Sequence, residues 1–256
     1  MTGAGRGIGR AAAFALAGRG AAVALSSRTK SEINYVADAV KEQGGRSLAT
    51  VVDVSARNRV EAAVREIEKA LGPIDILVNN AGVRAPLGRF WETDPEQWMR
   101  LIDINLGGAY YCMRAVLPGM VQRERGVIVN VSSGAGASTS PNWSAYATSK
   151  AALDHLTRCL GADLSGTRVR VFGLHPSLTD TSMLEVIRTA TDGQMPAERR
   201  QFFADQLAAG KVFPPEIPAR AIVWLCSSSC DLENGTVIDL RTQPEYLERI
   251  EAALKG

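Results

Sequence analysis

The sequence predicts an α/β fold, in which helices pack on both faces of a mostly parallel sheet in a three-layer, doubly wound arrangement. Two observations support this prediction. Short runs rich in β-branched residues alternate with longer runs of helical periodicity along the whole chain, which is the pattern of right-handed βαβ units. The short runs are also almost continuously apolar, as expected for strands that helices cover on both faces.

The expected elements follow one another in order. Strands are predicted at residues 23–25, 48–52, 74–78, 127–131, 168–171 and 236–238. Helices are predicted at approximately residues 7–19, 31–43, 56–71, 95–121, 144–165 and 216–227. Apolar residues recur at the spacing of a buried helix face, for example at Val60, Val64 and Ile67. No repeat or linker interrupts the pattern, so residues 1–256 are expected to form a single domain.

Two segments depart from the alternation. Residues 177–214 contain no convincing strand and end in Pro214-Pro215. An insertion after a late strand commonly folds over the carboxyl edge of such a sheet, so this segment is a candidate substrate lid; a pair of surface helices without a ligand role is the alternative. Residues 244–256 are expected to form a helical tail, which could contact a neighbouring subunit or cover the pocket.

Composition narrows the classes of function. The 256 residues carry a net charge of +2 and are 46% apolar, values of an ordinary globular enzyme, so neither nucleic acid nor membrane is expected as a partner. No apolar run approaches the roughly 20 residues that span a bilayer, and no signal peptide is recognised. The four cysteines are too scattered for a disulfide framework or a zinc site. Reduced thiols, a cytoplasmic location and no metal are therefore expected.

The chain begins with a glycine-rich turn. Between Thr2 and Gly9, the glycines are spaced so that the backbone can turn tightly and approach a pyrophosphate, which the N-terminal N–H groups of the next helix would bind. In a doubly wound sheet this turn follows the central strand, yet only Met1 precedes it. Unpaired ladder groups beside a missing strand cost about 1–3 kcal/mol each when buried. We therefore expect the sequence to lack roughly six to ten N-terminal residues, judged by a typical strand of about 5–6 residues.

Further motifs stand at the later strand ends and helix starts. They are Asn79-Asn80-Ala81-Gly82, Asn105, Ser133 and the pair Tyr146 and Lys150. In this order and spacing, and together with the glycine-rich turn, they resemble the short-chain dehydrogenase/reductase (SDR) family over almost the whole chain. The resemblance implies a Rossmann fold with about seven parallel strands, a nicotinamide dinucleotide cofactor and a homodimer or homotetramer. In this family the helices corresponding to residues 95–121 and 144–165 often form the subunit contact.

The motif residues suit proton transfer. Tyr146 and Lys150 are four residues apart, so they share one helix face, and a nearby ammonium lowers the tyrosine pKa from its reference value of about 10. Tyr146 is thus the expected general acid in reduction and general base in oxidation, and the resemblance implies that Lys150 also binds the nicotinamide ribose. Ser133 would hydrogen-bond the substrate oxygen, and family spacing favours it over Ser132. The resemblance assigns Asn105 to a proton-relay water; an amide that stabilises a kink is an alternative and compatible role.

The expected cofactor contacts lie at the turns that follow the strands. Small residues at Ala81 and Gly82 permit close backbone approach. Asp53 resembles a family position that contacts adenine, although the N-cap of the next helix is an equally open role. Thr179 replaces a commonly aliphatic residue, but the family contact there comes from the backbone. The expected cofactor-binding residues are Gly3, Arg6, Gly7, Ile8, Gly9, Ser27, Arg28, Asp53, Val54, Asn80, Ala81, Gly82, Tyr146, Lys150, Thr179 and Thr181.

The end of the strand predicted at residues 23–25 bears on the choice of cofactor. An NAD-preferring enzyme usually places an acidic residue here to bind the ribose 2′-hydroxyl, but this chain has Ser27, followed by Arg28. A guanidinium binds a phosphate through charge-assisted hydrogen bonds, and Arg6 could add a second cation. We predict NADP(H) rather than NAD(H); a surface role for Arg28 is the alternative.

The sequence therefore predicts an oxidoreductase that transfers a hydride between NADP(H) and a small-molecule carbonyl or secondary alcohol. The alternatives are a non-catalytic NADPH-binding sensor or scaffold, against which the complete set of proton-transfer residues argues, and an NAD-linked alcohol dehydrogenase of the same fold. Trp143 and Phe203 are among residues that suggest an apolar pocket, although each could belong to the core, so the substrate stays open. His175, which precedes a proline, is interpreted as structural rather than catalytic.

Overall fold

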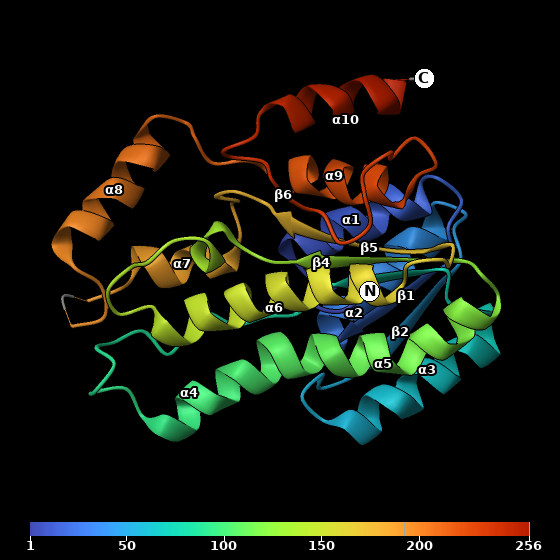
Figure 1. The fold of residues 1–256 in the computed structure, drawn as a ribbon, viewed down its shortest axis with the longest axis horizontal. Helices are drawn as coiled ribbons and strands as arrows, with labels where there is room; N and C mark the ends of the chain where they lie inside the picture. The colour runs from blue at the N-terminus through green and yellow to red at the C-terminus, as the bar shows by residue number, and fades with distance from the viewer. Residues whose placement is uncertain (192, 256) are drawn as a thin grey trace.

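The structure is a computed structural model that describes residues 1–191 and 193–255, and it has the predicted parallel α/β architecture (Figure 1). Its strands are β1 (Val23–Ser27), β2 (Ser47–Val51), β3 (Ile76–Asn79), β4 (Gly126–Val131), β5 (Val169–His175) and β6 (Val237–Asp239). Every strand pair is parallel; β2 pairs with β1, and β3, β4, β5 and β6 follow one another in that order. Each strand lies within a few residues of its predicted position.

Between β1 and β3, Met1 and Thr2 occupy the place of the central strand. Thr2 forms a single parallel bridge with Ser26, and its N–H donates to the Val78 carbonyl at 3.0 Å. The Met1 amino group donates to the Ala24 carbonyl at 2.8 Å. These residues join the two halves of the sheet at its carboxyl edge.

Helices cover both faces of the sheet and bury a separate apolar core on each. One face carries α1 (Gly7–Ala17), α2 (Lys30–Glu42) and α9 (Glu216–Cys226), and the other carries α3 (Arg57–Leu71), α5 (Gly108–Gln122) and α6 (Ser144–Asp163). Figure 1 shows α9 on one side of the strands and α3 with α5 on the other. None of the helices in the described residues is both long and apolar enough to cross a membrane.

The prediction of one uninterrupted helix at residues 95–121 is wrong in one respect. The segment is divided into α4 (Pro95–Ile102) and α5 by a π-helical turn at Asp103–Gly107. A π-turn adds a residue to the helical repeat and changes which side chains face inward, and such turns are frequent at functional sites. Here it contains Asn105, whose side chain is 1% exposed.

The described part of the segment 177–214 contains two helices. They are α7 (Ser182–Arg188) and α8 (Ala197–Ala208), and a single parallel bridge joins Thr179 to Phe213 at the base of the segment. Leu184, Met195 and Phe203 pack in an apolar cluster with Trp143 and Tyr146. Figure 1 shows α8 at one end of the molecule, beyond α7. The segment therefore lies beside the start of α6, next to the predicted catalytic tyrosine.

The C-terminal tail forms α10 (Glu245–Lys255), which packs on the outer side of α9 (Figure 1). The rings of Trp224 and Tyr246 lie 6.1 Å apart, and the Arg249 guanidinium lies 5.3 Å from the Trp224 ring. The tail was expected to touch a neighbouring subunit or to cover the pocket. In the structure it covers α9 of its own chain and lines neither of the cavities described below.

Candidate active site

The carboxyl edge of the sheet opens into a cavity of about 490 Å³. We call the part lined by Gly3, Arg6, Ser27 and Arg28 its glycine-rich end, and the part lined by Arg84, Ser133, Tyr146 and Lys150 its tyrosine end. All of the site residues that the sequence predicts line this cavity, with the exception of Gly9 and Asn105. The fold thus brings together side chains that are up to 178 residues apart, from Gly3 to Thr181.

Glycine is required at two positions of the glycine-rich turn. A Cβ atom on Gly9 would lie 2.2 Å from the Gly3 carbonyl oxygen and 2.6 Å from Nδ2 of Asn80. Gly7 has a φ of +52°, and a Cβ atom there would lie 2.9 Å from Cγ2 of Thr181. Gly9 therefore does not contact the cavity but allows the turn to fold back on the start of α1, while Gly7 leaves room beside Thr181.

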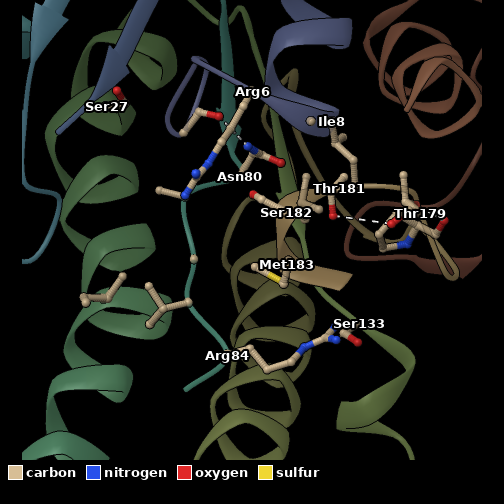
Figure 2. A pocket seen from close by; sticks show the side chains of 18 of the residues that line it. Arg6, Ile8, Ser27, Asn80, Arg84, Ser133, Thr179, Thr181, Ser182 and Met183 are labelled. Carbon is tan, nitrogen blue, oxygen red and sulfur yellow. Dashed lines mark hydrogen bonds between the residues drawn. The ribbon is translucent and has the colours of Figure 1, made fainter. Parts of the chain in front are cut away.

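Thr2 and Asn80 fasten the glycine-rich turn to the loop after β3. The Thr2 hydroxyl oxygen accepts hydrogen bonds from the N–H groups of Asn80 and Ala81, both at 3.1 Å. The Asn80 amide donates to the carbonyls of Thr2 at 3.2 Å and Gly3 at 3.0 Å. Figure 2 shows Asn80 beside Arg6 in the wall of the cavity. The Asn80 side chain thus holds the turn in shape, which the sequence did not indicate.

Charged side chains line the glycine-rich end. Arg6 approaches Glu32 at 3.8 Å, a weak pair because both side chains are partly exposed. Ser27 closes a local turn, in which its Oγ accepts from the Thr29 N–H at 3.1 Å. Arg28 is exposed, and among the described residues it forms no ion pair. At this end the cavity wall therefore carries the guanidinium groups of Arg6 and Arg28 and the carboxylate of Glu32.

Asp53 is held in place by its own loop. Its carboxylate accepts from the N–H and the hydroxyl of Ser55, at 3.0 and 2.7 Å, and pairs with Arg100 at 2.7 Å. Burial would raise the pKa of Asp53, but Ser55 and Arg100 lower it below its usual range. The N-cap of α3 is Ala56, so the capping role that the sequence left open for Asp53 is wrong. The residue stays in the cavity wall, ionised and fixed.

Ser133, Tyr146 and Lys150 meet at the tyrosine end. Ser133 follows β4, and its Oγ accepts from the Ala135 N–H at 3.2 Å, which fixes its rotamer. The Lys150 ammonium donates to the Val131 carbonyl at 2.9 Å and lies 5.9 Å from the centre of the Tyr146 ring. Ser132 instead donates its hydroxyl to the Lys150 carbonyl at 3.2 Å. Its partner is therefore the backbone of α6, which agrees with the choice of Ser133.

The environment of Tyr146 favours its phenolate. Burial alone would raise the pKa of Tyr146, but the charges of Arg84 and Lys150, together with hydrogen bonds from Ser133 and Arg84, lower it below 10. The Arg84 guanidinium lies 5.0 Å from the centre of the Tyr146 ring, and Figure 2 shows it pointing toward Ser133. A buried phenol with two cations beside it gives up its proton more readily than an ordinary tyrosine.

Asn105 positions the loop that carries Arg84. Its side-chain oxygen accepts from the Val83 N–H and its Nδ2 donates to the Val83 carbonyl, both at 2.8 Å, and Nδ2 also donates to the Ser149 hydroxyl at 3.0 Å. The Ser149 hydroxyl in turn donates to the Tyr146 carbonyl at 2.8 Å. The Asn105 side chain therefore links the π-turn, the Val83 loop and α6, which is the kink-stabilising role.

Thr179 and Thr181 form the wall opposite the loop after β3. The bridge to Phe213 uses the Leu178 carbonyl and the Asp180 N–H, so it leaves free the N–H and carbonyl of Thr179 itself. The Thr181 hydroxyl donates to the Thr179 carbonyl at 3.4 Å, as Figure 2 shows. Thr179 can thus offer its backbone N–H to a ligand, as the resemblance implies.

Beneath the tyrosine end lies a buried ionic cluster. His175 contacts Asp154 at 2.8 Å and Asp239 at 3.4 Å. Burial would lower the pKa of His175, but its two carboxylate partners raise it to about 9. Burial would raise the pKa of Asp239, but His175 and the N–H groups of Arg241 and Thr242 lower it to about 2. This cluster ties β5, α6 and β6 together, in agreement with the structural interpretation of His175.

Several functional side chains were missed by the sequence analysis. Arg84 was overlooked although it stands two residues after Gly82 and is a cation at the end of a motif. Glu32 was overlooked because helix α2 carries exposed charges throughout, and only the fold turns this one toward Gly5. The Thr2 hydroxyl accepts from the N–H of Asn80, and the Ser149 hydroxyl accepts from the side chain of Asn105. Both partners are far away in the sequence, so no local pattern indicates either contact.

The residues present fit a nicotinamide dinucleotide. The cavity runs from a glycine-rich turn at the start of α1, where a phosphate would meet backbone N–H groups, to the buried phenol of Tyr146. Gly3, Gly5 and Gly7 of this turn line the cavity, and the tight packing at Gly9 holds the turn against the start of α1. One cavity thus joins a glycine-rich turn to a buried phenol, an arrangement that suits a dinucleotide bound at the carboxyl edge of the sheet.

Comparison with known proteins identifies the family. Residues 1–192 match the family model described as short chain dehydrogenase. The meso-2,3-butanediol dehydrogenase of Serratia marcescens is 35% identical over 240 residues, which cover 93% of this chain and 90% of that protein. A crystal structure of a 3-oxoacyl-(acyl-carrier protein) reductase with bound NAD from Brucella melitensis superposes with a TM-score of 0.80 at 31% identity, covering 93% of this chain and 87% of that chain. For a crystal structure of NAD+-bound xylitol dehydrogenase the TM-score is 0.87 at 26% identity, with 93% and 95% covered. The chain belongs to the short-chain dehydrogenase/reductase family and is an oxidoreductase of that family.

Proposed function

We propose that this protein transfers a hydride reversibly between NADP(H) and a carbonyl or secondary-alcohol group, with Tyr146 as the proton donor and acceptor. One observation carries the proposal. Tyr146 is buried, its pKa is lowered by Arg84 and Lys150, and it stands at one end of a cavity whose other end is an anion-binding turn. A protein that only senses or stores the cofactor has no need of a tuned phenol beside it.

The side chains at the tyrosine end divide the chemistry between them. A bound nicotinamide dinucleotide supplies the hydride to the carbonyl carbon in reduction and accepts it in oxidation. Ser133 holds the substrate oxygen by a hydrogen bond, and Tyr146 gives that oxygen its proton in reduction, so that C=O becomes CH–OH. In oxidation the Tyr146 phenolate takes the proton back. Lys150 stabilises the phenolate by its charge, and Asn105 holds the surrounding loop and helix in register.

Other side chains would hold the cofactor. The backbone of the glycine-rich turn would hold the pyrophosphate, Asp53 and Val54 would contact the adenine, and the backbone of Thr179 would bind the carboxamide. Thr181 adds a hydroxyl beside Gly7. These assignments follow the family resemblance and are supported by the shared lining of one cavity.

The preference for NADP(H) rests on Arg6 and Arg28. Position 27 is a serine, so no carboxylate there would repel the 2′-phosphate of NADP(H). Among the described residues Arg28 has no acidic partner, so its guanidinium is available to bind that phosphate. Glu32, which contacts Arg6, favours the opposite choice, and two solved relatives carry NAD. The dissociation constants of NADPH and NADH measured for the wild type and for Arg28→Ala decide between them. We expect the variant to lose about 10-fold in NADPH affinity and to keep its NADH affinity; an unchanged NADPH affinity would refute the role of Arg28.

Three further expectations belong with this function. The segment 177–214 is proposed as a substrate lid, since Phe203 of α8 stacks on Trp143 at 5.8 Å beside Tyr146. A homodimer or homotetramer is proposed, supported by exposed apolar side chains such as Met99 and Tyr110 on α4 and α5. A cytoplasmic location is proposed, supported by four cysteines that are all unpaired.

The test of the proposed function is Tyr146→Phe. Removing the phenol hydroxyl should lower kcat at least about 1,000-fold, because proton transfer to the substrate oxygen is lost, and leave the cofactor dissociation constant within about 3-fold of wild type. Turnover is followed by NADPH absorbance with a panel of ketones and secondary alcohols. Tyr35→Phe, at a tyrosine that is 67% exposed on α2, is the matched control. Retained activity in Tyr146→Phe would sink the assignment; a wild type that binds NADPH but turns over nothing would favour the sensor alternative.

A further inference from the structure

A second, smaller cavity of about 70 Å³ adjoins the tyrosine end. Arg84, Ser133, Ser177 and Leu178 line both cavities, so the two share a wall at the site of proton transfer. The remainder of the small cavity comes from parts of the chain that the mechanism does not use. These are the turn after β4, Trp143, α8 and the end of β6.

Arginine dominates the charge of this small cavity. Arg84, Arg199 and Arg241 line it, and in the described part of the chain none of them pairs with an acidic side chain. The guanidinium groups of Arg84 and Arg199 lie 5.1 and 5.6 Å from the centre of the Trp143 ring. Two cations are thus held against one indole ring, without an anion between them.

Buried N–H donors in this region lack acceptors. Nε and Nη1 of Arg84, Nε of Arg199 and Nε1 of Trp143 are all buried and have no hydrogen-bond partner among the described residues. A buried donor without an acceptor costs about 1–3 kcal/mol, and more when it is charged. Four such donors lie on three neighbouring side chains, so a ligand with acceptor oxygens could satisfy them, and the positive charge of the arginines favours an anion.

The one acidic residue in the small cavity is already engaged. The Asp239 carboxylate contacts His175 at 3.4 Å and accepts from the N–H groups of Arg241 at 2.8 Å and Thr242 at 3.3 Å. Burial and the charges of Arg241 and Arg84 lower the pKa of Arg199. The Asp239 carboxylate is thus occupied by His175 and by backbone N–H groups, while Arg199 lies close enough to Arg84 and Arg241 to be affected by their charges.

We infer that the substrate carries a carboxylate, which Arg84, Arg199 and Arg241 bind in the small cavity while its alcohol or carbonyl group lies at Ser133 and Tyr146. The inference deepens the proposed function and rests on it. A carboxylate presents two oxygens in the plane in which a guanidinium presents its donors, and it is small enough for a cavity of about 70 Å³. Because Arg84 lines both cavities, the two functional groups of such a hydroxy acid or oxo acid are separated by a few bonds.

The test compares paired substrates. Linear and cyclic secondary hydroxy acids are each offered with NADP+ or NAD+ beside their methyl esters and the corresponding hydroxyalkyl phosphates. We expect kcat/KM for the acids to exceed that for the esters by about 10- to 100-fold, as a charged hydrogen bond provides. In Arg199→Gln and Arg241→Gln this ratio should fall toward unity. Arg65→Gln, at an exposed arginine of α3 that lines neither cavity, should keep it.

The outcomes separate the two proposals. Esters used as well as acids, phosphates preferred to acids, or a ratio that survives both arginine variants would each overturn the carboxylate site and leave the oxidoreductase function standing. If no alcohol in the panel is oxidised, the proposed function fails instead, and thermal stabilisation by cyclohexanecarboxylate decides the carboxylate site alone. Stabilisation that its methyl ester and inorganic phosphate do not reproduce, and that Arg199→Gln abolishes, would support the site; no stabilisation would overturn it.

Discussion

At the glycine-rich end of the main cavity polar groups satisfy one another, whereas at the tyrosine end several do not. Thr2 and Asn80 exchange hydrogen bonds with the turn and with each other's backbone, so that end keeps its shape without a ligand. Arg84 and Arg199 keep buried donors without acceptors, and both guanidinium groups lie close to the ring of Trp143. The glycine-rich end is preformed, which suits a cofactor that binds in every catalytic cycle. The unpaired donors of the tyrosine end favour binding of a ligand with negative charge and disfavour a neutral one.

The largest effect is expected at the buried ionic cluster of His175, Asp154 and Asp239, which lies beneath the tyrosine end. His175→Gln removes the cation between Asp154 and Asp239 and should lower the free energy of unfolding by about 3 kcal/mol near pH 6, because a buried carboxylate loses its partner. Chemical denaturation measures this. His155→Gln, at an exposed histidine of the same α6, is the control and should have little effect.

The pH dependence of that difference has a definite sign. The pKa of His175 is raised to about 9, above its ordinary value, so its stabilisation is complete below about pH 6.5 and fades as pH rises through 9. The pKa of Asp239 is lowered to about 2, so its contribution is complete above about pH 4 and fades as pH falls through 2. The difference in free energy of unfolding between wild type and His175→Gln should therefore decrease from pH 6 to pH 9. A difference that is constant over this range would mean that the cluster is not ionic.

The preformed shape of the glycine-rich end is tested by Gly9→Ala. The added methyl group meets the Gly3 carbonyl at 2.2 Å, so the turn must move away from Asn80. We expect at least about a 10-fold loss of NADPH affinity and about 1–3 kcal/mol of stability. In Gly193→Ala, where a Cβ meets nothing within 4 Å, both should stay unchanged. Normal cofactor binding in Gly9→Ala would show that the end adapts, contrary to the comparison.

Arg84→Met sharpens the comparison at the tyrosine end. The variant removes a charge that lowers the pKa of Tyr146, so in the oxidation direction the rising limb of kcat against pH should move up by about 1 pH unit. Arg89→Met is the matched control, since Arg89 lies on the same loop and contacts the ring of Trp91 rather than Tyr146. If only KM changes and the pH profile does not move, Arg84 acts on the substrate alone.

The smallest effect is expected from Glu32→Gln. Glu32 is the only acidic side chain near Arg6 among the described lining residues of that end, and the pair is solvent-screened. Removing its charge should tighten NADPH binding by about 2- to 5-fold and leave NADH binding unchanged. Glu42→Gln, at an exposed glutamate at the end of α2, is the control. Tighter NADH binding would show that the carboxylate does not act on an added phosphate.

Most of the fold was predictable from the sequence. The alternation of apolar runs and helical periodicity fixes strand and helix positions locally, so every predicted strand was confirmed. The break between α4 and α5 was not predictable, because a π-turn depends on the packing of Asn105 against Val83 and Ser149 rather than on local propensity.

Some residues of the candidate site were likewise predictable from the sequence, and others were not. The sequence by itself determined the glycine-rich turn and the Tyr146 and Lys150 pair, because spacing within a turn or a helix directly sets which groups meet. The preference for Ser133 over Ser132 came from the family resemblance, in which this distance to the tyrosine is the usual one. Only the tertiary structure decided that Arg84, Arg199 and Arg241 converge on one cavity beside Tyr146. They come from a loop, α8 and the end of β6, and a charge cluster assembled from distant segments leaves no pattern along the chain.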